Sequence, residues 1–271
     1  MDGAARGDLD WPRYLRPVPA PLRDILQEID LLLESDRFKD YGPNGLQVAG
    51  ATEVRTVASG VSAHAELFEL AAGAGAELLI VHHGLFWGSG PGPVDAALKH
   101  RLKLLFDADI ALAAYHLPLD AHPKLGNNAL LARAIGADTL QPFALHEGEP
   151  IGFIAHLAGD GVPIAELRSR VGDVTAREPL LFDAGPALVR RVGIVTGAGA
   201  DYLTQAAALG AEAFITGEAA ERTMAVAREA GIHFFAAGHY ATETFGIRRL
   251  GEHIAERFAL RHIFLDVPNP V

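Results

Sequence analysis

Residues 55–83, RTVASGVSAHAELFELAAGAGAELLIVHH, contain the pattern that decides the fold of this chain. An apolar run leads through a turn of small residues into a helical stretch, and a second apolar run then ends at His82 and His83. Short buried runs that alternate with helical stretches are typical of βαβ units. A helix at 94–109 and a strand at 110–116 continue the alternation. The sequence therefore predicts an α/β fold around a largely parallel or mixed sheet.

A second copy of this pattern occupies residues 191–218, RVGIVTGAGADYLTQAAALGAEAFITGE. Both copies have a Gly-Ala-Glu tripeptide before the second apolar run, and both continue through a helix into a third strand. That third strand ends in His-x-x-x-carboxylate each time, His116 to Asp120 and His239 to Glu243. Any two βαβ units resemble each other, but the shared ending is harder to attribute to chance. We therefore expect two linked, pseudo-repeated α/β lobes.

The repeat also suggests how the chain is divided. We expect an N-terminal tail (1–19), a first α/β lobe (20–138), a connector (139–188) and a second α/β lobe with a C-terminal segment (189–271). The tail is polar and aperiodic, and it contains three prolines. The first lobe opens with leucines and isoleucines at helical spacing, at positions 22, 25, 26, 29 and 32.

Composition limits the classes of function. The 271 residues carry a formal net charge of −11, which disfavours nucleic-acid binding because a nucleic-acid clamp needs a basic face. No apolar run reaches the roughly 18 residues that a membrane span requires. No cysteine is present, so disulfides and thiolate metal sites are excluded. With no signal peptide visible at the start, we expect a cytoplasmic protein.

Histidines and carboxylates follow the ends of three predicted strands, where open α/β sheets bind ligands. A lone histidine at such a place is more often structural, but six convergent groups favour a metal site. Imidazole and carboxylate ligands suit Zn, Mn, Fe, Co or Ni. Six ligands are too many for one catalytic zinc, so two divalent ions are predicted. The candidate ligands are His82, His83, His116, Asp120, His239 and Glu243.

Three further features are weaker. Glu218 holds the place in the second copy that His83 holds in the first, so it could transfer protons or simply begin the next helix. His122 could also move protons, although an ordinary loop residue fits equally well. The loop 196–200, TGAGA, could bind phosphate through its amides or be a plain strand–helix turn. Pro118 predicts a turn, not a helix, over residues 116–120.

Four long motifs carry a resemblance to a known family: NGLQVAG (44–50), ELLIVHHGLFWGSG (77–90), AYHLPLDAHPKLGNN (114–128) and the stretch 214–250. Over roughly residues 20–266 the chain resembles the GTP cyclohydrolase I type 2 homolog family, also called the NIF-three-like family, in its short bacterial branch. The departures are a longer N-terminal tail and VSAH at 61–64.

The resemblance implies a dinuclear metal centre in the cleft between two lobes, held by the same six residues, and hexameric rings built from dimers. It also implies opening of the GTP imidazole ring with loss of formate as one candidate reaction. Two hypotheses follow. The first is a metal-dependent hydrolase of a small, nucleotide-like substrate; the alternative is a non-enzymatic metal-binding regulatory or interaction protein that forms a ring scaffold.

Overall fold

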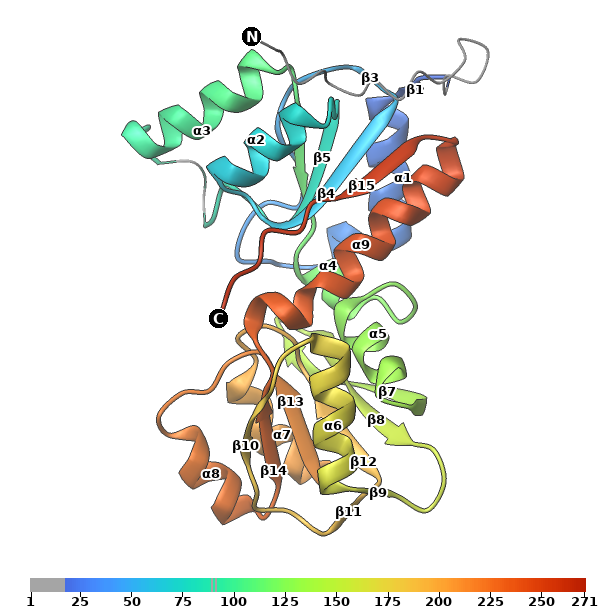
Figure 1. The fold of residues 1–271 in the computed structure, drawn as a ribbon, viewed down its shortest axis with the longest axis vertical. Coiled ribbons are helices and arrows are strands. Elements are labelled where there is room, and N and C mark those ends of the chain that lie inside the picture. Colours follow the sequence, from blue (N-terminus) through green and yellow to red (C-terminus); the bar gives the residue numbers. More distant parts are fainter. Residues whose placement is uncertain (1–17, 89, 91) are drawn as a thin grey trace, which may run out of the picture.

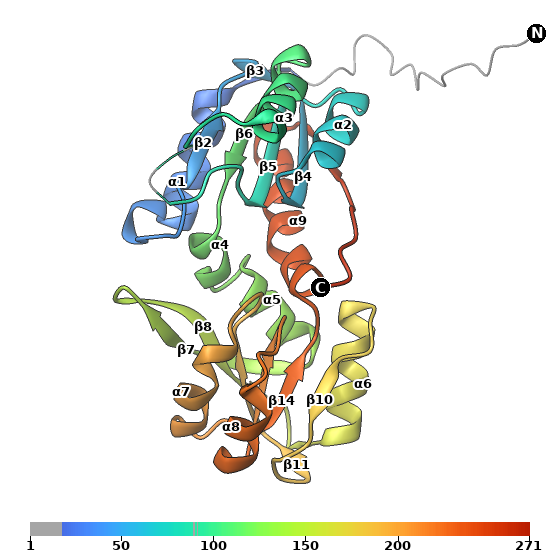
Figure 2. The same ribbon diagram turned by 90° about the vertical axis from the view of Figure 1, so that its left-hand side faces the viewer.

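The computed structural model describes residues 18–88, 90 and 92–271, so nearly all of the predicted tail lies outside the described residues. Two sheet-containing halves lie at opposite ends of an elongated molecule (Figures 1 and 2). Two short antiparallel pairs accompany them, β1 (Ala20–Pro21) with β3 (Glu53–Val54) and β9 (Val162–Pro163) with β11 (Leu188–Val189). In the described part of the chain, no helix is long and apolar enough to cross a membrane.

The first half contains a five-stranded sheet in the order β15-β4-β5-β6-β2. Strands β4 (Thr56–Ser62), β5 (Leu78–His83) and β6 (Ala111–Ala114) are parallel, as the alternation predicts. At one edge, β2 (Gly45–Val48) runs antiparallel to β6. At the other edge, the C-terminal strand β15 (Arg261–Phe264) runs parallel to β4.

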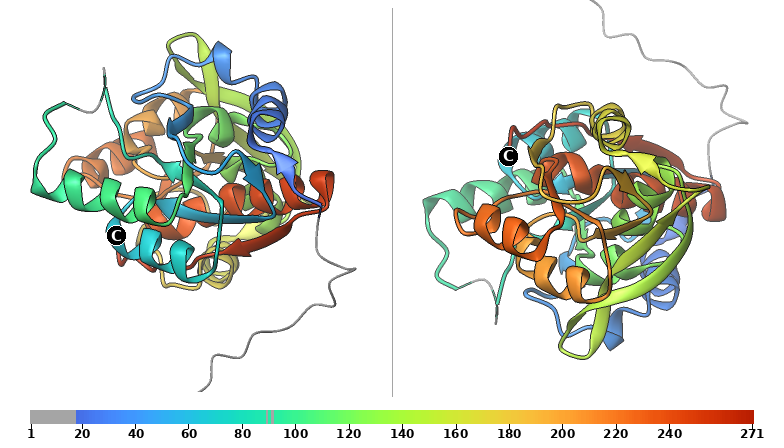
Figure 3. Two further views of the ribbon diagram at one scale, coloured as in Figure 1. Left: turned by 90° about the horizontal axis from the view of Figure 1, so that it is seen from above. Right: turned by 90° about the horizontal axis from the view of Figure 1, so that it is seen from below.

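Helices cover both faces of this sheet, as the view from above shows (Figure 3). Because strand side chains alternate between faces, neighbouring residues Val57 and Ala58 belong to two separate buried clusters. On one side the core includes α1 (Leu22–Leu33) and α9 (His239–Phe258). On the other side lie α2 (Ala65–Gly73) and α3 (Ala96–Asp107). The helix predicted from the leucine and isoleucine stripe is confirmed as α1.

The second half contains a six-stranded sheet in the order β10-β14-β13-β12-β8-β7. Its parallel centre consists of β12 (Arg191–Ile194), β13 (Ala213–Thr216) and β14 (His233–Ala236). The helices η3 (Ala200–Tyr202), α7 (Leu203–Ala208) and α8 (Thr223–Ala230) connect these strands. The centre repeats the strand order of β4, β5 and β6, so the two copies seen in the sequence are two parallel βαβαβ units.

The expected connector, residues 139–188, contributes to this second sheet. It contains most of β7 (Ala137–His146), and β8 (Glu149–Leu157), which pairs antiparallel with β12. It also contains α6 (Ile164–Thr175) and β10 (Leu180–Phe182), an antiparallel neighbour of β14. These segments cover apolar surface of the repeat that would otherwise face water.

Each βαβαβ unit leads into a helix that carries the His-x-x-x-carboxylate pair. The first is α4 (Leu117–Ala121), followed by α5 (Asn127–Ala134), and the second is α9. The turn predicted over 116–120 is therefore wrong. Pro118 lies in the first helical turn, where a missing N–H costs no intrahelical hydrogen bond. His239, expected at the end of a strand, lies in α9, because β14 ends at Ala236.

Candidate metal centre

The fold brings the six predicted ligands together between the two halves. His82 and His83 end β5, and His116 precedes α4 directly. His239 and Glu243 are four residues apart in α9, a spacing that places both side chains on one helix face. Ligand atoms within 4.8 Å of one another form three groups: His82, His83 and His116; His83, His239 and Glu243; and His82, Asp120 and Glu243.

Adjacent residues His82 and His83 both reach the site, with ring centroids 4.7 Å apart. They are the last two residues of β5, where the chain leaves the sheet. A β-carbon at Gly84 would collide with the amide of Gln47. That amide accepts hydrogen bonds from the Leu85 and Phe86 N–H groups, at 2.7 and 3.1 Å. These contacts fix the turn after β5, so both imidazoles stay at the carboxyl end of that strand.

Each histidine is oriented through its Nδ1 atom. His82 Nδ1 donates to the Tyr115 carbonyl at 3.1 Å, and His83 Nδ1 lies 3.0 Å from Ser62 Oγ. His116 Nδ1 donates to Asp40 Oδ1 at 2.8 Å, and His239 Nδ1 donates to Glu218 Oε1. The second ring nitrogen, Nε2, is left for the site in all four, which is the arrangement usual for metal-binding histidines. The histidines and their partners are the pairs His82–Tyr115, His83–Ser62, His116–Asp40 and His239–Glu218.

The two carboxylates are buried among these imidazoles. Asp120 Oδ1 accepts hydrogen bonds from Asn127 Nδ2 at 2.8 Å and Thr196 Oγ1 at 3.3 Å, and Asp120 Oδ2 lies 3.6 Å from His82 Nε2. Glu243 belongs to two of the three groups. Its Oε1 is 3.5 Å from His82 Nε2, and its Oε2 is 3.1 and 3.2 Å from the Nε2 atoms of His83 and His239.

Two buried atoms at the centre, His82 Nε2 and Glu243 Oε2, have no hydrogen-bond partner within the described protein. Unpaired buried polar atoms are costly, so native proteins rarely keep them without a reason. An imidazole nitrogen and a carboxylate oxygen that face one another across more than 3 Å fit a divalent cation between them. The donor set present therefore fits metal ions.

Electrostatics in the metal-free protein point the same way. Burial lowers the pKa of His82, but Asp120 and Glu243 outweigh burial and raise that pKa to about 9. Burial also lowers the pKa of His239, but the carboxylates of Glu243 and Glu218 outweigh burial and raise that pKa to about 9. Burial alone would raise the pKa of Glu243, but the neighbouring imidazoles hold that pKa well below its usual value. Without metal, protons supply the positive charge that this site requires.

The ligands open onto a cavity of about 450 Å³ between the halves, which His83, His116, Asp120, His239 and Glu243 help to line. Gly197, in the loop after β12, allows the second half to approach closely. A β-carbon there would collide with Glu243 Oε1 and lie 3.0 Å from His239 Nε2, and the φ of +63° also favours glycine.

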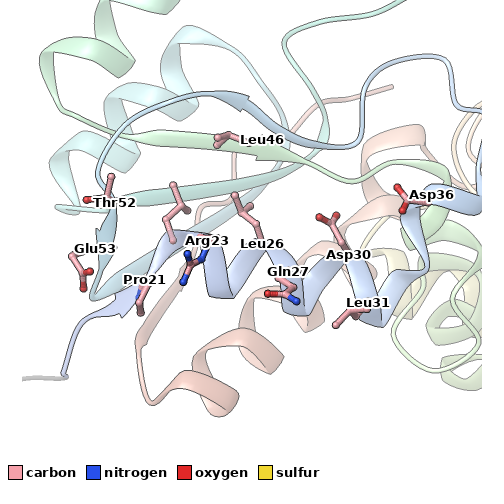
Figure 4. A pocket seen from close by; sticks show the side chains of 11 residues that line it. Pro21, Arg23, Leu26, Gln27, Asp30, Leu31, Asp36, Leu46, Thr52 and Glu53 are labelled. Carbon is pink, nitrogen blue, oxygen red and sulfur yellow. The ribbon is translucent and has the colours of Figure 1, made fainter.

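A larger groove, of about 810 Å³, runs along the exposed side of α1 (Figure 4). It is lined by leucines and carboxylates, including Leu26, Leu31, Asp30 and Glu53, and by none of the six ligands. Volume alone does not mark the chemical site, and the smaller cavity carries the convergent imidazoles.

The weaker predictions have different outcomes. Glu218 does not begin α8, which starts five residues later, but hydrogen-bonds His239. His122 belongs neither to the candidate ligand cluster nor to the lining of the cavity beside that cluster. Its Nδ1 accepts hydrogen bonds from the N–H groups of Lys124 and Leu125, at 3.1 and 2.9 Å. A proton-transfer role for Glu218 or His122 stays a prediction.

The loop at 196–200 borders the cavity, but its amides are used within the protein. Thr196 N donates to Asn128 Oδ1 at 2.7 Å, and Gly197 N and Gly199 N donate to threonine hydroxyls at 3.2 and 3.0 Å. A phosphate cradle built from these three amides is therefore not supported. The loop holds Asn128 and the neighbouring threonines, which in turn border Asp120.

The sequence did not indicate the residues that hydrogen-bond the candidate ligands and orient them. Asp40 accepts hydrogen bonds from His116 Nδ1 and from the Leu117 N–H at 2.8 Å each, and Asn44 Oδ1 accepts the His116 N–H at 2.9 Å. Asn127 holds Asp120 and, through Oδ1, accepts the Gly246 N–H at 2.6 Å. Both polar clusters stand within or beside quoted motifs, in the turn before β2 and in the segment after His122, but nothing local indicates which distant ligand they contact.

Taken together, the sheets and the buried clusters define a mixed α/β protein with a candidate site for metal ions. The chain belongs to the Duf34/NIF3 (NGG1p interacting factor 3) family, which it matches over residues 20–270. This confirms the resemblance seen in the motifs.

Relatives named GTP cyclohydrolase 1 type 2 homolog are similar over nearly their whole length. The Pseudomonas aeruginosa protein is 45% identical over 250 residues, which are 92% of this chain and 98% of that protein. The Escherichia coli K12 protein is 45% identical over 249 residues, 91% of this chain and 98% of the relative. Both relatives are bacterial.

Solved structures agree with the fold. Protein ybgI, described as of unknown function, is 43% identical with a TM-score of 0.86, over 93% of this chain and 100% of that chain. TTHA1606 from Thermus thermophilus is 35% identical with a TM-score of 0.85 and the same coverage. Reduced HcgD from Methanocaldococcus jannaschii, 22% identical with a TM-score of 0.79, shares the fold.

Proposed function

We propose that this protein is a metal-dependent hydrolase of a small, nucleotide-like molecule, with two divalent ions in the cleft between two pseudo-repeated lobes. One observation carries the proposal: four imidazoles and two carboxylates form one cluster beside the cavity, and two of their buried atoms lack a hydrogen-bond partner among the described residues. Ring opening of GTP, the reaction in the relatives' name, is one candidate reaction.

The three ligand groups suggest how the residues would divide the ions. Glu243 takes part in two groups and is suited to bridge them, while His116 and His239 each belong to one group. When bound, such a pair of ions acidifies a water molecule and polarises the bond under attack. The chain's own contribution is to hold the ligands rigidly, through Asp40 and Glu218, and to enclose the substrate.

The test combines metal analysis with turnover. Purified protein is loaded in turn with Zn, Mn, Fe, Co and Ni, its metal content is measured, and GTP, other nucleotides and phosphoesters are offered as substrates. We expect about two ions per chain, on the donor count usual for two-metal sites, and turnover that His239→Ala abolishes. Two tightly held ions without turnover of any substrate contradict the hydrolase and favour the non-enzymatic alternative.

Assembly into a hexameric ring also stays a prediction. The mass of the purified protein in solution, measured by light scattering after size-exclusion chromatography, tests it independently of any activity. A monomer at micromolar concentration contradicts the ring.

A further inference from the structure

Three aromatic side chains line the cavity beside the candidate metal ligands, and no role in metal binding accounts for them. Tyr41 precedes β2, Trp87 follows β5, and Tyr202 ends η3 in the other half. Tyr41 and Trp87 remain 56% and 45% exposed. Large aromatic surface left open at the rim of a cavity is a common feature of binding sites for small molecules.

The aromatic groups lie directly against the metal ligands. The ring centroid of Trp87 is 5.3 Å from that of His116 and 5.9 Å from that of His83. The Tyr41 ring is 6.1 Å from His116. A ring that stacks on Trp87 or Tyr41 would therefore lie close to His116.

The first-half part of this rim is held in place. The Gly88 N–H donates to the Tyr41 carbonyl at 2.6 Å, which ties the two aromatic loops together. A β-carbon at Gly42 would lie 2.7 Å from the Phe86 carbonyl oxygen, so the loops also touch. Tyr41 N donates to the Asp40 carboxylate at 2.7 Å, the same carboxylate that orients His116. The aromatic rim and the ligand are thus positioned by one residue.

The remaining lining is suited to an uncharged ring. Leu117, Ile151 and Val195 are apolar, and the amide of Asn128 is occupied by protein hydrogen bonds. Among the described residues that line the cavity, none is lysine or arginine. Stacking, rather than a cationic side chain, is the recognition that these walls offer.

We infer that Tyr41, Trp87 and Tyr202 form a stacking subsite for a planar heteroaromatic ring, and that the ligand is of the nucleobase or nucleoside class. The subsite places the ring beside His116 and His83, two of the candidate metal ligands. A cavity of about 450 Å³ falls in the range of small-molecule sites. This inference rests on the proposed function, because it narrows the class of the substrate. Binding of the ring can nevertheless be measured without turnover.

The experiment is calorimetric titration of the metal-loaded and metal-free protein with guanosine, adenosine and ribose 5-phosphate. We expect both nucleosides to bind and ribose 5-phosphate to bind far more weakly. Trp87→Ala should weaken nucleoside binding by about 5- to 150-fold, the range for loss of one stacked base, while Trp87→Phe restores most of it. Phe106→Ala, an exposed aromatic on α3, is the matched control and should change nothing.

Three outcomes overturn the subsite: nucleosides do not bind, Trp87→Ala binds them as the unaltered protein does, or ribose 5-phosphate binds equally well. Metal content is measured in every variant and should stay unchanged in Trp87→Ala. Loss of metal there would make Trp87 a structural support of the ligands and would also overturn the inference. Failure of the hydrolase shows instead as absent turnover with ring binding intact, so the two failures are distinguishable.

Discussion

The two βαβαβ units share a topology but contribute unequally to the candidate metal centre. The first unit ends β5 in two imidazoles, His82 and His83, whereas the corresponding end of β13 leads to Gly217 and Glu218. The first copy thus contributes four of the candidate ligands and the second copy two. A repeat can preserve its fold while the strand ends diverge, because folding depends on the buried apolar runs and not on the polar residues that follow them.

The helices after the third strands differ as well. α4 is 5 residues long and contacts β8 of the second sheet, while α9 is 20 residues long and packs its apolar face on the first sheet. His239 and Glu243 are therefore delivered by a helix that belongs to both halves. Asp40 and Glu218 play matching parts, each orienting the histidine after a third strand, but the Asp40 side chain is buried and that of Glu218 is 41% exposed.

The largest effect on metal content should come from Glu243, which belongs to two of the three candidate ligand groups. Glu243→Gln removes the charge that two ligand groups share, so we expect the loss of both ions and of any stabilisation by added metal. Elemental analysis and thermal unfolding with and without metal measure this. The control is Glu252→Gln on the same helix, whose carboxylate forms a partly exposed ion pair with Arg249 and belongs to none of the three groups. Retention of both ions in Glu243→Gln would remove Glu243 from the bridge.

Next come the two histidines that belong to one group each. His116→Ala and His239→Ala should each lower the bound metal by one ion, because each histidine belongs to a single group and its loss leaves the candidate ligands of the other ion in place. Comparing the two variants by elemental analysis separates the contribution of the first half from that of the second. Unchanged stoichiometry in either variant excludes that histidine as a ligand.

The orienting carboxylates should have a smaller effect. Asp40→Asn and Glu218→Gln should weaken metal binding by about 10- to 100-fold each, the range for partners of ligating histidines. Asp40→Asn should lie at the upper end because Asp40 is buried and also accepts the Leu117 and Tyr41 N–H groups. Competition with a chelator of known affinity measures both. Equal affinities in the two variants would show that burial of the carboxylate does not matter.

The most subtle effect is a proton release. The pKa values of His82 and His239 are raised to about 9, so both side chains are positively charged imidazolium groups at neutral pH in the metal-free protein. Metal must displace these protons, and apparent affinity should rise as pH increases toward 9 and level off above it. Calorimetry in buffers of different ionisation enthalpy counts the protons. Binding enthalpies that are independent of the buffer at pH 7 contradict this.

Local sequence was sufficient for much of the fold. Alternating apolar runs identified the strands β4, β5, β6, β12, β13 and β14, because burial on both faces requires such runs. The helical turn at Pro118 was missed, since proline disfavours helix interiors but not first turns. Residues 139–188 lack the repeat pattern, and their pairing with β12 and β14 depends on contacts distant in the sequence.

The chemical character of the site could be read from the chain alone: six imidazole and carboxylate groups, without cysteine, after three buried strands. Their protein partners could not. Asp40 and His116 lie 76 residues apart, and they meet because β2 pairs with β6 in the folded first sheet. Tertiary structure also leaves His82 Nε2 and Glu243 Oε2 without a hydrogen-bond partner among the described residues, and it places Trp87 and Tyr41 beside His116. Residue types determine which ions the site can bind. Tertiary structure decides which imidazole nitrogens and carboxylate oxygens are buried together without a protein partner.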